Sequence, residues 1–139
     1  MIKVYPKLWL SNRMEITNVD LKGLVDVIVY LGQEMNEPSL THGNSLPVIH
    51  FPLNDGHNPK SKYIVLNGIL SYLTNVRNAR VCLACRYGQS RSPAIAIAYL
   101  MRSEGFEFSY AFMIVSRRVK GFLPKQELLE DIKGLEATL

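Results

Sequence analysis

Apolar residues along the chain form four short runs that are separated by polar and turn-forming segments. The runs cover residues 7–10, 25–31, 48–53 and 81–84. Their length and their content of Val, Ile and Leu predict β-strands. The runs at 25–31 and 81–84 are apolar at almost every position, which is typical of strands that are buried on both faces of a parallel sheet.

Helical periodicity appears between and after these runs. Apolar residues recur at helical spacing from 61 to 76, with Ser61 as a candidate N-cap. A short helix is predicted over 17–22, before Gly23. Three more helices are predicted over 92–102, over 109–120 and from about 124 onward. We expect Ser92-Pro93 to open the first of these, with Pro93 at its first position, and Ser109 to cap the second.

The order of the elements predicts the fold class. Strands alternate with helices and a run of helices follows, which favours an α/β fold with a central, mostly parallel sheet of four to five strands. Helices would flank this sheet, and the last ones would form a C-terminal helical group. The 139 residues suit one domain, so we expect a single catalytic domain over residues 1–139.

Composition and charge narrow the function classes. The net charge is +4, which suits an anionic partner, but no Lys/Arg-rich run predicts nucleic-acid binding. No apolar run approaches the roughly 20 residues of a membrane span. The first residues lack the layout of a signal peptide. We therefore expect a cytoplasmic protein, a monomer, with no membrane or nucleic-acid partner.

The segment from Val81 to Pro93 carries the clearest chemical signal. It joins a predicted buried strand to a predicted helix start through a short loop, with Cys85 at the first loop position and Arg91 six residues later. A loop that wraps into a helix N-terminus points backbone N–H groups at one place, where an anion of phosphate size binds. The same field favours an ionised Cys85, and only the thiolate is a competent nucleophile.

The other loop residues complete this expectation. The planar guanidinium of Arg91 can grip two phosphate oxygens at once, and Ser92 can donate a hydrogen bond toward the sulfur. Gly88 allows a tight turn. We expect substrate phosphate to be bound mainly by the backbone N–H groups of the loop, which comprises Arg86, Tyr87, Gly88, Gln89 and Ser90.

These residues resemble the Cys-x5-Arg-Ser/Thr signature of the cysteine-based protein tyrosine phosphatases. The continuation from Ser90 to Met101, Ser-Arg-Ser-Pro-Ala-Ile-Ala-Ile-Ala-Tyr-Leu-Met, is similar to the dual-specificity branch of small, single-domain enzymes. Residues 5–11 and 111–119 resemble the opening strand and a later helix of that family. The resemblance implies hydrolysis of phosphotyrosine, and of phosphoserine or phosphothreonine, in protein substrates through a phosphocysteine intermediate, with no metal and no cofactor.

A general acid is expected on a second loop. Asp55 follows a predicted strand, and Gly56 and Pro59 keep its loop from being helical. Its position 30 residues before Cys85 (85 − 55 = 30) is similar to the offset of the acid loop in the family. The alternative role for Asp55 is to cap a turn. The catalytic set predicted here is therefore Cys85, Asp55, Arg91 and Ser92.

The chain also departs from the family pattern. The family usually has His immediately before the nucleophile, where this chain has Ala84. The family often carries an additional phosphate-facing Arg on the helix after the catalytic one. Arg117 and Arg118 are near that place, and the sequence does not decide which of them faces the site.

Several alternatives remain open. Related loops act on phosphoinositides or on RNA 5′-triphosphate ends, and a chain without catalytic power could still bind phosphoproteins. Cys82 and Cys85 also form a Cys-x-x-Cys pair, which can be a redox pair or half of a zinc site. On a strand their Cα atoms lie about 10 Å apart, too far for a disulfide. The spacing of His42, His50 and His57 suggests no zinc ligands. We therefore expect Cys82 to be a small core residue.

Overall fold

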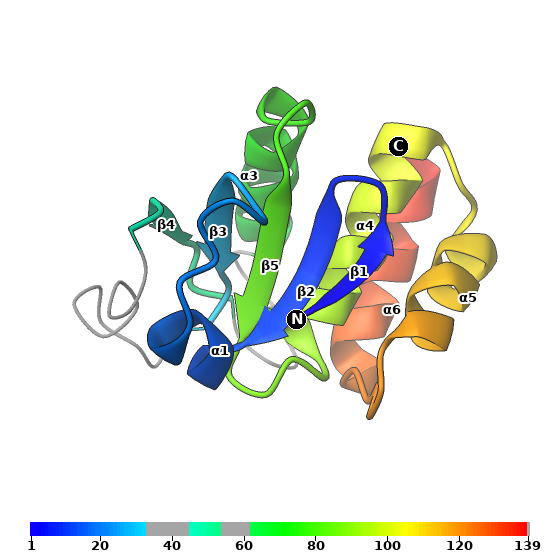
Figure 1. Cartoon of the computed structure of the whole chain (residues 1–139). Helices are drawn as coiled ribbons and strands as arrows, with labels where there is room; N and C mark the ends of the chain where they lie inside the picture. Colours follow the sequence, from blue (N-terminus) through cyan, green and yellow to red (C-terminus); the bar gives the residue numbers. More distant parts are fainter. Residues whose placement is uncertain (33–44, 54–61, 139) are drawn as a thin grey trace.

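A five-stranded sheet forms the centre of the molecule (Figure 1). The computed structural model describes residues 1–32, 45–53 and 62–138. The strands lie in the order β1-β2-β5-β3-β4. Their bounds are β1 Ile2–Tyr5, β2 Leu8–Asn12, β3 Val27–Tyr30, β4 Val48–His50 and β5 Val81–Cys85. Only β1 is antiparallel to its neighbour among these strands, which confirms the mostly parallel α/β sheet.

Most helices cover one face of the sheet. These are α3 Lys62–Asn75, α4 Arg91–Glu104, α5 Phe108–Arg118 and α6 Gln126–Gly134, which a short 3-10 helix, η1 Leu135–Thr138, extends. A short helix, α1 Arg13–Asn18, lies on the opposite side (Figure 1). The predicted C-terminal helical group is thus present as α4, α5 and α6.

Two apolar layers follow from this arrangement. The larger one packs the sheet against α3, α4, α5 and α6, and α4 is its central helix, with the sequence from Arg91 to Ala98 buried throughout. The smaller one lies on the α1 side and includes Ile16, Tyr30, Cys82 and Ala84. Because both faces are covered, β3 and β5 are buried at every position, as their apolar sequences predict.

Element boundaries differ from the sequence expectations in several places. The first helix covers 13–18 rather than 17–22, because the Asn12 side chain accepts a hydrogen bond from the Glu15 N–H and caps it there. α4, the helix after β5, starts at Arg91, which places Pro93 third in the helix rather than first. Glu107, not Ser109, precedes α5. The strand β1 was not predicted. Ser61 lies outside the described residues.

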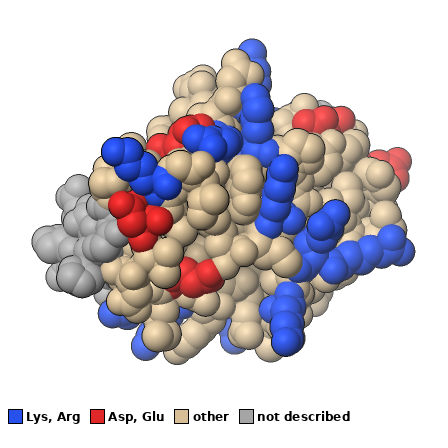
Figure 2. All heavy atoms as spheres, in the orientation of Figure 1, with Lys and Arg blue, Asp and Glu red and all other residues tan. Residues whose placement is uncertain are grey.

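The surface in the orientation of Figure 1 is unevenly charged. Lys and Arg side chains gather on the half of this face where β1 and the C-terminal helices lie (Figure 2). Within the described ranges, no helix has both the length and the apolar composition needed to cross a membrane.

Candidate active site

The loop that follows β5 lies at the carboxyl edge of the parallel strands. Cys85 ends β5, residues 86–90 form the loop, and Arg91 begins α4. β5 is the central strand and α4 the most buried helix, so both ends of the loop are anchored in the core. Rigid anchors hold the loop in the shape that a binding site needs.

The sulfur of Cys85 is held by Ser92. Its Sγ lies 3.3 Å from Ser92 Oγ and accepts a hydrogen bond from the Ser92 backbone N–H at 3.4 Å. Ser92 is in the first turn of α4, where N–H groups have no partner within the helix. The helix start therefore directs positive potential at the sulfur, which favours negative charge there. The predicted association of Cys85 with Ser92 is present in the structure.

Arg91 points toward the same site. The residue is only 7% exposed, and its Nη1 donates to the backbone carbonyl of Leu53 at 3.4 Å. Arg91 and Cys85 line one pocket of about 170 Å³. Cys85 is 2% exposed, and its position in the lining makes it part of the pocket wall as well as of the core. A guanidinium and a sulfur in one small pocket provide a cation and a nucleophile for the same anion.

Gly88 fits the loop against the end of β2. Its φ of +73° is in the left-handed region, which favours glycine. A Cβ atom at this position would lie 3.1 Å from the backbone oxygen of Ser11. The Arg13 N–H also donates to the Arg86 carbonyl at 3.3 Å. The end of β2 thus supports the loop from one side, which the sequence did not predict.

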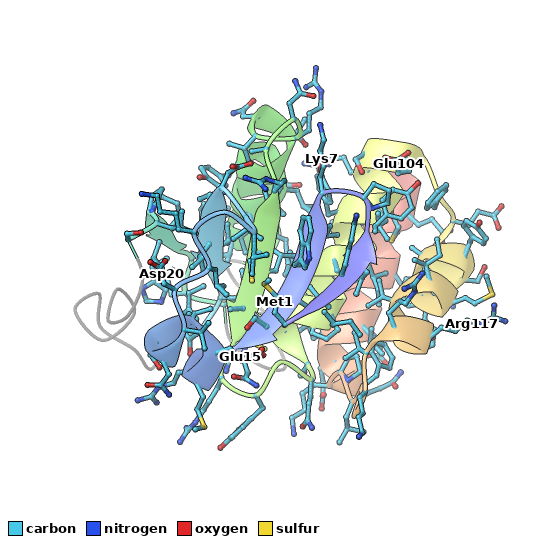
Figure 3. All side chains as sticks on the ribbon, in the orientation of Figure 1. Met1, Lys7, Glu15, Asp20, Glu104 and Arg117 are labelled. Atoms are coloured by element: carbon cyan, nitrogen blue, oxygen red, sulfur yellow. The ribbon has the colours of Figure 1, made fainter. Side chains whose placement is uncertain are left out.

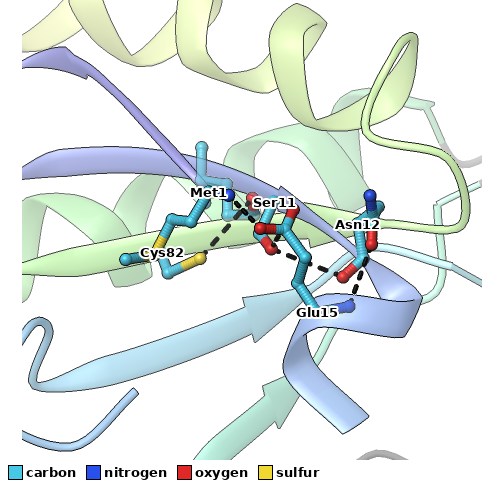
Figure 4. A network of polar contacts seen from close by, with 6 residues as sticks. Met1, Ser11, Asn12, Glu15 and Cys82 are labelled. Carbon is cyan, nitrogen blue, oxygen red and sulfur yellow. Dashed lines mark hydrogen bonds and ion pairs between the residues drawn. The ribbon is translucent and has the colours of Figure 1, made fainter. Parts of the chain in front are cut away.

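A polar network stabilises this support. Ser11 Oγ donates to Glu15 Oε1 at 3.1 Å, and the Met1 amino group pairs with the other carboxylate oxygen of Glu15. Figure 3 places Met1 and Glu15 side by side at this end of the sheet, with Lys7 and Glu104 at the other end. Figure 4 shows the contacts among Met1, Ser11, Asn12, Glu15 and Cys82. These contacts of Ser11 and Glu15 help to fix the end of β2 and the start of α1, against which the loop packs.

The segment before α6 forms the other side of the pocket. The Leu123 N–H donates to the Gln89 carbonyl at 2.8 Å, and the Lys125 N–H donates to Ser90 Oγ at 3.0 Å. Leu123 and Lys125 line the pocket with Cys85, Arg91, Tyr87, Gln89 and Ser90. The sequence did not predict either residue, because both are more than 30 positions from Cys85. Gly121 and Pro124 are residues typical of a turn, but they do not indicate where in the fold that turn lies.

Cys82 has the environment of a core residue. It is fully buried on the α1 side of the sheet, and both cysteines are free. Burial, reinforced by the nearby Glu15 carboxylate, raises the pKa of the Cys82 thiol to about 12. A thiol with such a pKa is protonated at neutral pH and reacts slowly. The prediction that Cys82 is structural is consistent with this, and a redox role for the pair is not supported.

Two other predictions have structural outcomes. Ala84 is fully buried beside its strand neighbours Ser11 and Tyr30, and Tyr30 is also fully buried. The position where the family has His therefore lies in a filled apolar layer. Arg117 and Arg118 are both exposed and line a groove beside β1, not the Cys85 pocket.

Asp55, the predicted general acid, lies outside the described residues, so its role stays a prediction. Leu53, two positions earlier, ends the described part of that segment, and its carbonyl accepts the hydrogen bond from Arg91. The chain therefore approaches the pocket just before Asp55. Among the residues with described positions, no three His, Cys, Asp or Glu side chains are grouped as metal ligands.

Comparison with known proteins agrees with this geometry. The family model described as the catalytic domain of dual specificity phosphatases matches residues 8–137. Human dual specificity protein phosphatase 7 is 24% identical over 141 residues, which cover 99% of this chain and 33% of that protein. Human dual specificity protein phosphatase 1 is 26% identical over 139 residues, which cover 98% of this chain and 37% of that protein. The chain thus spans about a third of the length of these relatives.

Solved structures show the same architecture. The crystal structure of human DUSP28 matches with a TM-score of 0.84 at 19% identity, covering 99% of this chain and 96% of that chain. At this identity the similarity establishes the fold alone. The family model, in contrast, covers nearly the whole sequence, including the loop from Cys85 to Arg91. The chain therefore belongs to the dual-specificity phosphatase catalytic-domain family.

Proposed function

We propose that this protein is a metal-independent protein phosphatase that hydrolyses phosphotyrosine, and phosphoserine or phosphothreonine, through a phosphocysteine intermediate. The observation that carries the proposal is the contact of Cys85 Sγ with both the N–H and the hydroxyl of Ser92, in a pocket shared with Arg91. A residue that only filled the core would have no use for a helix start, a hydroxyl and a guanidinium around its sulfur.

In the first step, the Cys85 thiolate attacks phosphorus. The S–P bond forms while the P–O bond to the substrate side chain breaks, and Asp55 donates its proton to the departing oxygen. Arg91 and the N–H groups of residues 86–90 hold the phosphoryl oxygens as their charge redistributes. In this role Arg86, Tyr87, Gly88, Gln89 and Ser90 form the phosphate-binding loop.

In the second step, water attacks the phosphocysteine. Asp55, now ionised, takes a proton from the water, a new P–O bond forms, and the S–P bond breaks to release phosphate. Ser92 Oγ, at 3.3 Å, donates a hydrogen bond to the sulfur as it becomes a thiolate again. The positive end of α4 stabilises the same charge, so no metal ion is required.

Phosphoproteins are the proposed partners. The pocket rim carries Tyr87 and Leu123, which are 67% and 73% exposed, so the phosphorylated side chain meets an apolar border. We further propose that residues 1–139 act as one monomeric domain in the cytoplasm. A reducing compartment would keep the nucleophilic thiol of Cys85 free. Both cysteines are free in the structure.

Hydrolysis of p-nitrophenyl phosphate in the presence of EDTA tests the proposal. We expect turnover by the wild type and none by Cys85→Ser, because a serine hydroxyl is scarcely ionised at neutral pH. Cys82→Ser is the matched control, since its sulfur lies outside the pocket, and it should retain most of the activity if it folds. Equal activity of Cys85→Ser and the wild type would rule the mechanism out.

The substrate class is tested separately. Phosphate release from phosphotyrosine and phosphothreonine peptides is compared with release from inositol phosphates and from triphosphorylated RNA. If either non-protein substrate were hydrolysed faster than the phosphopeptides, that substrate would define the substrate class instead of phosphoproteins. Binding of phosphopeptides without any hydrolysis would instead indicate a phosphoprotein-binding module.

A further inference from the structure

A second hollow lies between β1 and α5, away from the Cys85 pocket. It has a volume of about 600 Å³, several times that of the pocket around Cys85. None of its lining residues also lines the Cys85 pocket. The lining residues are Lys3, Val4, Tyr5, Pro6, Tyr110, Met113, Ile114, Arg117 and Arg118, and we refer to this hollow as the β1–α5 groove.

The charged side chains at one end of the β1–α5 groove are all basic. Arg117 and Arg118 come from the last turn of α5 and are exposed, and none of the lining residues is acidic. Figure 3 shows Arg117 pointing outward at the edge of the molecule. Figure 2 shows Lys and Arg side chains gathered on this half of the face. An anionic ligand is therefore attracted to the Arg117 end of the groove.

The opposite end of the groove has a different character. There the Tyr5 hydroxyl donates a hydrogen bond to the carboxylate of Glu104, which is not a lining residue. Burial, and after it the negative charge of Glu104, raise the pKa of Tyr5. The ammonium of Lys3 lies 5.3 Å from the centroid of the Trp9 ring, and Trp9 packs against the apolar layer on the α1 side of the sheet. The arginines at one end and the Glu104 carboxylate near the other favour an acidic ligand at the Arg117 end of the groove.

Apolar side chains form the body of the groove. Val4 is 4% exposed, Met113 and Ile114 are half-buried, and Tyr110 is 49% exposed. Apolar groups of this kind accommodate one or two apolar side chains of a ligand and release ordered water. Arginine, methionine and aromatic residues are enriched at protein–protein interfaces, where arginines can pair with carboxylates and apolar surface can hold an apolar anchor.

The adjacent strand limits how such a peptide binds. β1 is an edge strand, but its register to β2 shifts between Lys3 and Tyr5. A bulge in an edge strand interrupts the regular row of backbone groups that an added strand would need. Recognition in the β1–α5 groove therefore depends on side chains rather than on extension of the sheet.

We propose that the β1–α5 groove binds an extended acidic segment of a partner protein, with its carboxylates at Arg117 and Arg118 and an apolar side chain between Tyr110 and Ile114. This inference goes beyond the proposed phosphatase reaction, because binding there needs no chemistry at Cys85. It also needs no phosphate group on the peptide.

Fluorescence anisotropy of the full chain with a labelled, unphosphorylated peptide of alternating Glu and Leu tests this inference. We expect saturable binding that weakens about tenfold in the double variant Arg117→Ala/Arg118→Ala. The control variant Lys22→Ala/Lys133→Ala removes the same charge from positions outside the groove and should bind as the wild type does. Binding of the wild type should also weaken at high salt.

Three results would overturn the inference. One is an equal loss of affinity in the control variant, which would indicate a non-specific charge effect. Another is equal binding of a peptide of alternating Lys and Leu. The third is binding of vesicles that contain phosphatidylserine, but not of the acidic peptide, which would indicate a membrane surface instead of a protein partner.

The reaction at Cys85 gives an independent readout. Hydrolysis of p-nitrophenyl phosphate should be the same in Arg117→Ala/Arg118→Ala and in the wild type, since neither arginine lines the Cys85 pocket. Hydrolysis without peptide binding would overturn the groove inference and leave the phosphatase proposal standing. Peptide binding without hydrolysis would do the reverse.

Discussion

Gly88 is the residue at which the loop after β5 comes nearest to the end of β2. Two constraints act on it at once: a left-handed backbone with φ of +73°, and the Ser11 carbonyl, which would lie 3.1 Å from a Cβ atom. Gly105, at the end of α4, has nearly the same φ, +69°, but nothing lies within 4 Å of its Cβ position. A comparison of alanine substitutions at Gly88 and Gly105 therefore separates the cost of a left-handed backbone from the cost of a steric clash.

Gly88→Ala should destabilise the protein by about 2–4 kcal/mol and abolish most activity, since the loop must move away from Ser11. Gly105→Ala should cost about 1 kcal/mol and leave activity nearly unchanged. Thermal unfolding and p-nitrophenyl phosphate hydrolysis measure both effects. Equal losses of stability in the two variants would show that the contact with Ser11 has no cost.

Ser92 is the second residue whose role is local. Its N–H remains at the sulfur in Ser92→Ala, because the backbone is unchanged, and only the hydroxyl contact at 3.3 Å is lost. The hydroxyl matters most when the sulfur leaves phosphorus, so breakdown of the intermediate should slow by about 10- to 100-fold.

We therefore expect Ser92→Ala to show a burst of p-nitrophenolate followed by slow turnover, with kcat reduced far more than kcat/KM. Rapid-quench measurements of the phosphocysteine would reveal its accumulation. Ser116→Ala, on α5 and outside the Cys85 pocket, is the control. Equal reductions of kcat and kcat/KM, without a burst, would place Ser92 in the first step instead.

At the scale of elements, an ion pair joins the starts of β3 and β5 at the edge opposite the site. Arg80 donates from its backbone N–H and its Nε to Asp26 Oδ2, at 2.7 and 3.2 Å, and from Nη2 to Oδ1 at 2.9 Å. These hydrogen bonds lower the pKa of the Asp26 carboxyl from 3.8 to about 2. The pair aligns two neighbouring parallel strands where both enter the sheet.

The lowered pKa has a consequence for stability. Because the folded protein holds Asp26 ionised more strongly than the unfolded chain does, the contribution is present above about pH 4. It is lost as the pH falls from about 4 to 2. Asp26→Asn should therefore lower Tm at pH 6, and the difference from wild type should shrink toward pH 2.

Thermal unfolding of the wild type, Asp26→Asn, Arg80→Ala and the double variant between pH 2 and 6 measures this coupling. In the Arg80→Ala background, Asp26→Asn should change Tm much less at pH 6. A pH-independent difference between Asp26→Asn and the wild type would contradict the assignment to this ion pair.

At the scale of the whole molecule, the Cys85 pocket is formed by segments that are far apart in the sequence. The loop after β5, the carbonyl of Leu53 and the segment before α6 converge there, and hydrogen bonds from Leu123 and Lys125 to Gln89 and Ser90 join two of them. Lys125 brings an exposed positive charge to the pocket wall. In the proposed reaction, that charge attracts the phosphate monoester dianion of the substrate before any bond changes.

Lys125→Ala should raise KM for p-nitrophenyl phosphate about fivefold with little change in kcat, because an exposed charge contributes on the order of 1 kcal/mol to binding. The effect should diminish with added salt. Lys120→Ala removes a charge from the same connecting segment but outside the Cys85 pocket, and should leave KM unchanged. A loss confined to kcat would instead implicate Lys125 in the chemical steps.

The sequence by itself determined the features that depend on neighbouring residues. Apolar runs predicted four of the five described strands, and the two runs that are apolar almost throughout became β3 and β5, which are buried at every position. Cys85, Arg91 and Ser92 could be predicted as a group, since a strand end, a short loop and a helix start bring residues so near in sequence together. β1 was missed, because a short edge strand buries few side chains, and its burial pattern has little alternation.

Only the tertiary structure decided which distant residues reach the site. Ser11, Leu123 and Lys125 lie 30 or more positions from Cys85, and their approach depends on the strand order and on how α5 and α6 pack. The same packing places Arg117 and Arg118 in the lining of the β1–α5 groove, outside the Cys85 pocket. Local sequence preferences specify the helices and strands. Which elements become neighbours depends on the long-range packing of their apolar faces, and the spacing of residues along the chain does not predict it.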